Sequence, residues 1–192
     1  DNQTTTQTFT IAVNAVNDSP VIGEVADVSI PEDTLQKSIT ITGIDAGGGE
    51  NQKTRLTGSV SNESLFTSWA LDHTIGAANA SLDITPVPNQ YGTSDITVIV
   101  EDAGLDNSFE TAADNKVSSQ TFTFTIQAIN DPPVFAELES FAIQKNSSEI
   151  QVQVAEITSG PLETQPLSFS VTSSNAELIP TPAITYNQGD SN

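Results

Sequence analysis

The sequence has 192 residues, a formal net charge of −20 with only five basic residues, and neither cysteine nor methionine. Such an acidic surface repels phosphate groups, which argues against nucleic acid as a partner, and no signal peptide or membrane-inserting stretch is visible. Because no disulfide can form, each folded unit must bury its own core or gain stability from a bound ion.

Alternation of polar and apolar residues predicts short strands along most of the chain. The first expected strand is 8–13, and Asn17-Asp18-Ser19-Pro20 ends that run because proline cannot donate to a ladder. The strands expected next lie at 25–30, 38–42, 55–60, 65–71, 79–85, 95–101 and 119–129. The residues expected to point inward on the last three are Ala80, Leu82, Ile84, Ile96, Val98, Val100, Phe122, Phe124 and Ile126.

Turn signals separate these runs at regular intervals, and no convincing helical period interrupts them. The glycine-rich stretch 46–49 is expected to be a turn, because it lacks the lysine and the following helix of a phosphate-binding loop. Seven short strands with this spacing predict an all-β sandwich with an immunoglobulin-like pattern. The number of strands leaves the order of the strands in the sheets open.

An internal repeat runs through the chain with an offset of 131 − 18 = 113 residues. The motif at residues 16–20 recurs at 129–133, and the motif at 7–10 recurs at 120–123. Further matched positions are Gly47 and Gly160, Glu50 and Glu163, Gln52 and Gln165, Ser61-Asn62 and Ser174-Asn175, and Leu65 and Leu178. A fixed period of this size indicates one structural unit copied in tandem.

The repeat predicts three parts of the chain. Residues 1–17 are expected to be the last strand of a preceding repeat, and residues 18–131 a complete β-sandwich repeat. Residues 132–192 are expected to be the first half of a following, truncated repeat. The strands expected there, matching the first four of the complete repeat, lie at 141–143, 150–154, 167–171 and 183–186.

Four motifs carry a resemblance to a known family: Val16-Asn17-Asp18-Ser19-Pro20, Ile30-Pro31-Glu32-Asp33-Thr34, and the stretches 84–92 (ITPVPNQYG) and 96–104 (ITVIVEDAG). Together they resemble the tandem cadherin-like and Ig-like repeats of very large bacterial surface proteins, in particular Bacteroidota adhesins, including those of gliding bacteria. The resemblance covers nearly the whole chain. It implies tandem seven-stranded Ig-like or cadherin-like β-sandwiches that form an extracellular stalk or adhesin at the cell surface.

The resemblance leaves the role within such a protein open. The alternatives are a glycan-binding module and a spacer within a secreted multidomain enzyme. The implied partners are neighbouring repeats of the same chain and, beyond them, other surface proteins or glycans. The chain itself is not expected to be an enzyme, because it has no nucleophile elbow and its acidic residues cluster at the ends of units.

The resemblance also implies Ca²⁺ at the junctions between repeats, where oxygen ligands of both neighbours would meet. The residues carried over to the first junction are Asn17, through its backbone carbonyl, with Asp18, Asp45 and Asp102; those carried over to the second are Glu32, Asn130 and Asp131. The alternative is that these Asp and Asn residues only make turns by bonding their own backbone. The acidic loop 101–107 is a second calcium candidate, whose alternative is a solvated hairpin.

Two further features have weaker functional interpretations. A sugar could stack on Trp69 and a metal could bind His73, but packing is the favoured interpretation of both residues. The triplet Asp33-Thr34-Leu35 resembles an acceptor for protein O-glycosylation in Bacteroidota, and its alternative is a plain strand end.

Overall fold

The computed structural model describes residues 1–187 and divides into two compact units, Asp1–Gln127 and Ala128–Asn192. The first unit contains the strands β1 (Val28–Pro31), β2 (Lys37–Ile41), β3 (Thr54–Val60), β4 (Phe66–Asp72), β5 (Ala80–Pro86), β6 (Gly92–Asp102) and β7 (Val117–Gln127), with one 3-10 turn, η1 (Glu63–Leu65). Each of the strands expected between residues 25 and 129 is present, with its ends displaced by a few residues.

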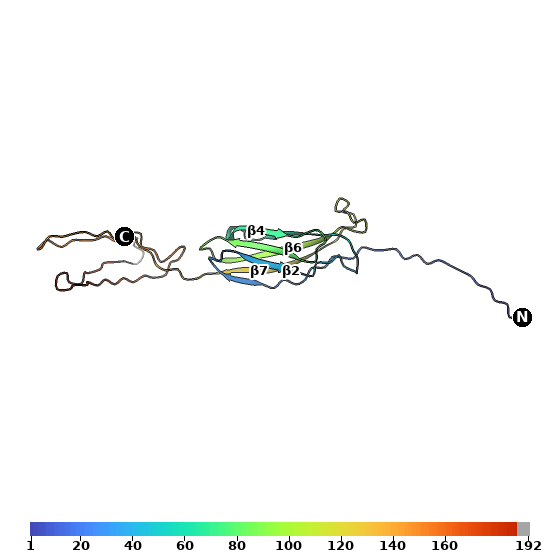
Figure 1. Ribbon diagram of the computed structural model, residues 1–192, viewed down its shortest axis with the longest axis horizontal. Helices are drawn as coiled ribbons and strands as arrows, with labels where there is room; N and C mark the ends of the chain where they lie inside the picture. The colour runs from blue at the N-terminus through green and yellow to red at the C-terminus, as the bar shows by residue number, and fades with distance from the viewer. Residues whose placement is uncertain (188–192) are drawn as a thin grey trace. The chain divides into compact units, whose positions relative to one another are not determined.

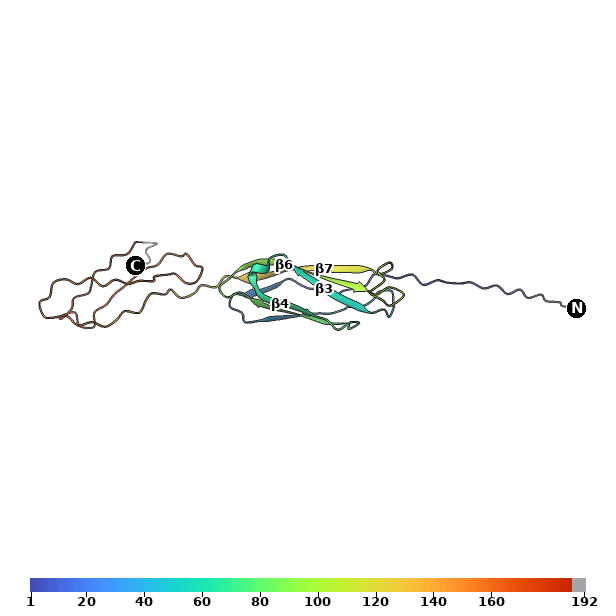
Figure 2. The ribbon, with the colours of Figure 1, turned by 90° about the horizontal axis from the view of Figure 1, so that it is seen from above.

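The strands of the first unit form two sheets, ordered β1-β7-β6-β3 and β2-β5-β4 (Figure 1). In Figure 2 the two sheets appear as two layers: the strands β3, β6 and β7 form the upper layer of the picture and β4 lies in the lower one. All strand pairs are antiparallel except β1 with β7, which is parallel. The prediction of an all-β sandwich is therefore confirmed for this unit.

The core lies between the two sheets and is made by alternate residues of the strands. All nine residues expected to point inward on β5, β6 and β7 are buried. Phe124 is fully buried and meets Phe66 of the opposite sheet edge to face, with ring centroids 5.7 Å apart. Burying one large apolar side chain contributes ~1.5–3 kcal/mol, so this core can hold the unit together without a disulfide.

Strand pairing in the first unit follows one rule. Each of β1 to β4 pairs only with a strand from the set β5 to β7: β1 with β7, β2 and β4 with β5, and β3 with β6. The first half of the unit therefore makes no ladder of its own. Apart from the isolated bridge of Val21 with Asp45, the pairing of its strands needs the second half.

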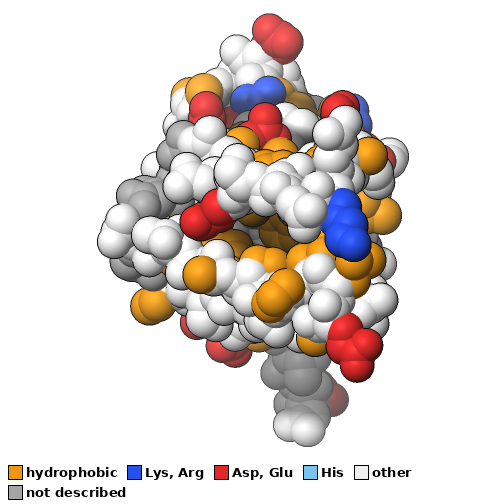
Figure 3. All heavy atoms as spheres, turned by 90° about the vertical axis from the view of Figure 1, so that its left-hand side faces the viewer, with side chains coloured by type: hydrophobic (Ala, Val, Ile, Leu, Met, Phe, Trp, Pro, Cys, Tyr) orange, Lys and Arg blue, Asp and Glu red, His pale blue; other side chains and the backbone are white. Residues whose placement is uncertain are grey.

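The second unit has none of the four strands expected in it; among its described residues the only pairing is an isolated bridge between Val134 and Thr158. The pairing rule above gives a physical reason, because β1 to β4 pair only with β5 to β7, and residues 128–187 contain no strand that could replace these partners. Apolar side chains such as Phe141 and Ile143 are consequently more than half exposed. Figure 3 shows apolar side chains open to view, among polar ones, on the face of the molecule that it displays.

The expected strand at 8–13 is also not formed, and residues 1–16 are exposed. At the repeat offset, β7 corresponds to residues 4–14, and β7 itself is held between β1 and β6, whereas no strand lies beside residues 4–14. A strand without ladder partners has nothing to hold it, so the assignment of residues 1–17 to a preceding repeat stays a prediction.

Candidate functional site

Asn17 is the centre of a polar cluster at the end of the first unit where the N-terminal segment joins the sandwich. Its side chain is almost fully buried, with 4% exposed. Asn17 Nδ2 donates to Asp102 Oδ1 at 2.9 Å and to the Asp114 carbonyl at 2.7 Å, while Asn17 Oδ1 accepts from Gln52 Nε2 at 2.7 Å. Lys116 Nζ donates to the Asn17 carbonyl. We call these five residues the Asn17 clasp.

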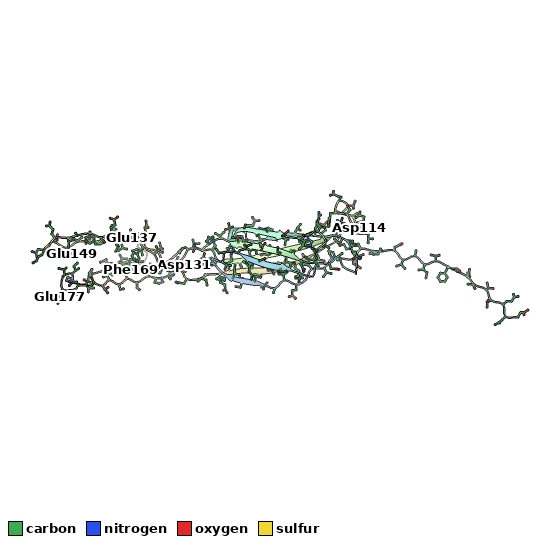
Figure 4. All side chains as sticks on the ribbon, in the orientation of Figure 1. Asp114, Asp131, Glu137, Glu149, Phe169 and Glu177 are labelled. Atoms are coloured by element: carbon green, nitrogen blue, oxygen red, sulfur yellow. The ribbon has the colours of Figure 1, made fainter. Side chains whose placement is uncertain are left out.

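The Asn17 clasp joins the incoming chain to two loops of the sandwich. Gln52 precedes β3, Asp102 ends β6, and Asp114 and Lys116 lie in the loop between β6 and β7. Figure 4 shows Asp114 at the end of the sandwich that the N-terminal segment reaches. The clasp therefore ties the linker before the unit to loops that only the folded unit brings together.

Asp102 is fully buried in this clasp. Its Oδ1 accepts three hydrogen bonds, from Asn17 Nδ2 and from the backbone N–H groups of Gly104 and Lys116 at 2.9 and 3.1 Å. Asp102 Oδ2 and Gln52 Oε1 are buried without a hydrogen-bond partner in the described chain. Buried oxygens without a partner are rare in native structures, and a bound water or ion is one way to satisfy them.

The other two ligands predicted for the first junction make different contacts. Asp45 Oδ1 accepts from Gly47 N at 2.8 Å, which is the turn bonding that was the alternative for this residue. The backbone N–H of Asp18 donates to Glu50 Oε2 at 3.0 Å. The Asp18 carboxylate lies against Gly48, where an added Cβ would come within 2.1 Å of Asp18 Oδ2. Of the four predicted ligands, only Asn17 and Asp102 bond each other.

Sequence reasoning missed three members of the clasp, Lys116, Asp114 and Gln52. The Lys116 ammonium lies on the same carbonyl of Asn17 that was expected to bind calcium. The only signal for Lys116 was its place among five basic residues, at the end of an acidic loop. Gln52 could have been found, because the repeat matches it to Gln165.

The second unit repeats part of this arrangement at the offset of 113 residues. Gln165 Nε2 donates to Asn130 Oδ1 at 2.9 Å, as Gln52 does to Asn17. The Asp131 N–H donates to Glu163 Oε1 at 2.9 Å, as that of Asp18 does to Glu50. The repeat seen in the sequence is therefore also a repeat of hydrogen bonds.

Backbone geometry extends the correspondence between the units. The bridge of Val134 with Thr158 matches the bridge of Val21 with Asp45. Left-handed backbone conformations recur at the offset, with φ values of 62° and 65° at Asp33 and Asn146, 70° and 56° at Gly43 and Glu156, and 79° and 56° at Gly49 and Leu162. The loops of the second unit thus adopt the turns of the first although the strands between them are not formed.

The residues predicted for the second junction fall in different units. Glu32 is buried in the first unit, and its N–H donates to the Gln127 carbonyl at 2.9 Å. Asn130 and Asp131 begin the second unit and make the contacts given above. No group of three or more His, Cys, Asp or Glu side chains placed to hold a metal occurs among residues 1–187.

The acidic loop after β6 uses its side chains within the first unit. Glu101 Oε2 accepts from Arg55 at 2.8 Å, and this hydrogen bond lowers the pKa of Glu101 against the opposing effect of its partial burial. Asp106 accepts from Ser108 N at 3.0 Å, and Asn107 Oδ1 accepts from Lys53 N at 2.8 Å. These bonds agree with the hairpin alternative for this loop.

Trp69 and His73 both make contacts within the first unit, as the packing interpretation expects. Trp69 is partly buried and packs against the core, and His73 Nε2 lies 2.9 Å from the Ala77 carbonyl. The triplet 33–35 forms a turn in which the Thr34 hydroxyl donates to the Pro31 carbonyl at 2.7 Å, and Leu35 is 90% exposed.

No family model matches the chain, and no curated protein matches it. Among residues 1–187 there is no helix long and apolar enough to cross a bilayer.

Proposed function

We propose that this chain is part of a structural stalk or adhesin, built from tandem Ig-like or cadherin-like sandwiches in a large extracellular bacterial surface protein. The observation that carries the proposal is the recurrence of the same hydrogen bonds at the start of two consecutive units, Asn17 with Gln52 and Asn130 with Gln165. An array whose units all begin in the same way spaces its units regularly, which is what a stalk requires.

The path of the chain through the first unit supports this role. Asn17 contacts Lys116 just before β7 begins, whereas Glu32 contacts Gln127 where β7 ends. The chain therefore joins the unit at one end and leaves it at the other, and the 11 residues of β7 span about 36 Å between them at ~3.3 Å each. Each unit adds its length to the array. The net charge of −20 keeps neighbouring arrays apart.

We also propose that Ca²⁺ stiffens the start of the first unit. Asp102 Oδ2 and Gln52 Oε1 would hold the ion, because both are buried oxygens without a hydrogen-bond partner and both side chains bond Asn17. Calcium takes six to eight oxygen ligands, so water oxygens would complete the set. Glu32, Asn130 and Asp131 remain the proposed ligands of the second junction.

The calcium proposal is tested by a thermal melt of the chain in EDTA and then across a calcium titration, with magnesium as the ion control. We expect a calcium-selective rise in Tm, equivalent to ~2.7 kcal/mol at a concentration 100 times the Kd. Asp102→Asn should abolish the rise, while Asp106→Asn, which alters a turn in the same loop, should keep it. No rise at millimolar calcium would contradict the calcium site and leave the stalk proposal standing.

The stalk proposal is tested by small-angle scattering from a chain with two complete consecutive repeats. We expect an elongated particle of about twice the length of one repeat, ~70–80 Å from the strand rise. A compact particle with the repeats folded onto each other would contradict the stalk. The spacer alternative shares this geometry, and a catalytic domain elsewhere in the same open reading frame would favour it.

A further inference from the structure

We propose that Lys116 is a built-in counter-cation of the Asn17 clasp and that it competes there with calcium. When calcium is scarce, the Lys116 ammonium supplies positive charge to the clasp and holds the Asn17 carbonyl. When calcium binds, the ammonium leaves that carbonyl to the ion. The competition rests on the calcium site of the proposed function, whereas the role of Lys116 without calcium depends on the folded unit alone.

Asp102 is a carboxylate that needs positive charge nearby. It is fully buried, and the groups that donate to its Oδ1 are neutral, namely the Asn17 amide and two backbone N–H groups. Removing a carboxylate from water is costly unless a charge of opposite sign compensates it. The clasp therefore needs a cation in addition to these hydrogen bonds.

Lys116 is the basic side chain that is placed to supply this charge. The stretch 101–116 carries five carboxylates, and Lys116 is its one basic residue. Arg55 of β3 is already in an ion pair with another carboxylate of this stretch. Lys116 reaches the clasp at two points, because its N–H donates to Asp102 Oδ1 at 3.1 Å and its ammonium donates to the Asn17 carbonyl.

The ammonium compensates the charge of Asp102 without satisfying its second oxygen. Among residues 1–187 the Lys116 ammonium makes no ion pair, and Asp102 Oδ2 is left without a hydrogen-bond partner. A lysine carries one positive charge, whereas Ca²⁺ carries two and binds six to eight oxygens directly. A calcium ion could therefore replace the ammonium and also satisfy the oxygen that the ammonium leaves unpaired.

The two cations exclude each other for an electrostatic reason. An ion held by Asp102 Oδ2 and Gln52 Oε1 would lie beside Asn17, because both side chains bond the Asn17 amide. The ammonium lies on the carbonyl of the same residue, and two positive charges at such short range repel each other. Lys116 is exposed and has a flexible stem, so it can swing into water without disturbing the core. Lys116 thus weakens calcium binding and stabilises the clasp when calcium is absent.

A matched pair of substitutions in the full 192-residue chain tests this role, Lys116→Met and Lys53→Met. Both variants lose one positive charge. Lys53 is also exposed, and its carbonyl accepts from Ala103 N at 2.9 Å, so it is tied to the same acidic loop. Its side chain makes no hydrogen bond to the part of the chain that the structure describes. Thermal melts in EDTA give the stability without calcium, and calorimetric titration gives the calcium affinity.

We expect Lys116→Met to lower the Tm in EDTA by ~2–5 °C and to tighten calcium binding roughly tenfold. Lys53→Met should change both quantities much less, and Lys116→Arg, which keeps the charge, should stay close to the unsubstituted chain. Equal changes in the two methionine variants would overturn the proposal, because they would assign the effect to net charge. An unchanged calcium affinity in Lys116→Met, or no calcium binding even there, would overturn it as well.

These results are separable from those of the proposed function. A calcium response that appears only in Lys116→Met would contradict calcium binding by the unsubstituted chain and support the competition. Calcium binding that is equally tight in the unsubstituted chain and in Lys116→Met would keep the calcium site and overturn the competition.

Discussion

The first and second units share the contacts at their beginnings but differ in their sheets. Both hold a leading Asn with a Gln and a leading Asp with a Glu, at nearly equal distances. Among the described residues, 1–187, only the first unit has ladders, and each of its early strands pairs with a late strand. The difference shows that the contacts at the start of a repeat form within its first half. The two sheets, in contrast, form only when the strands of its second half, β5 to β7, are present.

The difference also explains why Asn17 is buried while Asn130 is exposed. Asn17 is covered by Asp102, Asp114 and Lys116, which flank the junction of β6 and β7. The Asn130 side chain instead bonds Gln165 and the adjacent Asp131 carbonyl. A leading Asn is therefore locked in place only when the late strands of its own unit are folded.

The largest expected effect comes from giving the second unit partners for its predicted strands, copied from the first unit. A copy of residues 80–131 appended after Asn192 would begin in register, because 80 + 113 = 193. We expect residues 141–186 to form strands and gain about 5 kcal/mol or more of stability, the lower end for a folded domain. Hydrogen exchange across 134–186 measures this, with a scrambled copy of the same residues as the control. Unchanged exchange would mean that the second unit does not share the fold of the first.

A smaller effect is expected from removing the leading Asn of each unit. Asn17→Ala deletes three side-chain hydrogen bonds, one of them to a buried carboxylate, and should cost about 2–3 kcal/mol. The matched variant Asn130→Ala changes an exposed residue and should cost at most ~0.5 kcal/mol. Urea denaturation of both variants measures the two costs. Equal costs would show that the late strands do not lock Asn17.

The smallest expected effect concerns an ion pair of the first unit, Arg55 with Glu101 at 2.8 Å. Because Arg55 lowers the pKa of Glu101 in the folded state, the pair stabilises the unit above the ordinary carboxyl pKa of about 4.5. That stability is lost as the pH falls through the lowered value. Glu101→Gln should cost ~0.2–1 kcal/mol at pH 7 and flatten the pH dependence of stability below pH 4.5.

The control for this ion pair is Asp95→Asn, on the same strand. Asp95 is exposed and accepts a hydrogen bond from the Thr123 hydroxyl at 3.1 Å without a basic partner. Its variant should keep the acid dependence of the unsubstituted chain. A pH profile that flattens equally in both variants would assign the effect to net charge rather than to Arg55.

The sequence was sufficient to predict where the strands of the first unit lie and which side chains face the core. Alternation on β6, for example, predicted that Ile96, Val98 and Val100 point inward, and all three are buried. The same alternation also predicted a strand at 8–13 and strands in the second unit, which do not form. Alternation reports the face that a strand could bury, and it says nothing about whether a partner strand is present.

The candidate site was predictable in part for a related reason. Asn17, Asp18, Asp45 and Asp102 were identified from motifs, but the motifs did not show that Asp45 would bond its own turn. Lys116 is 99 residues from the carbonyl that it contacts, and no local pattern links the two positions. Gln52 could be found from the repeat, because the same residue type at matched positions of two units indicates a shared contact even when the contact partner is unknown.

The sequence by itself determined the period of 113 residues, the acidic surface, the turns that recur at that offset and the inward faces of the strands. These follow from local chemistry, since backbone preferences and side-chain alternation act within a few residues. Only the tertiary structure decided that β1 runs parallel to β7, that Asn17 is buried, and that Lys116 lies on its carbonyl. Those contacts join residues about a hundred positions apart, and they exist only after the two halves of one repeat pair.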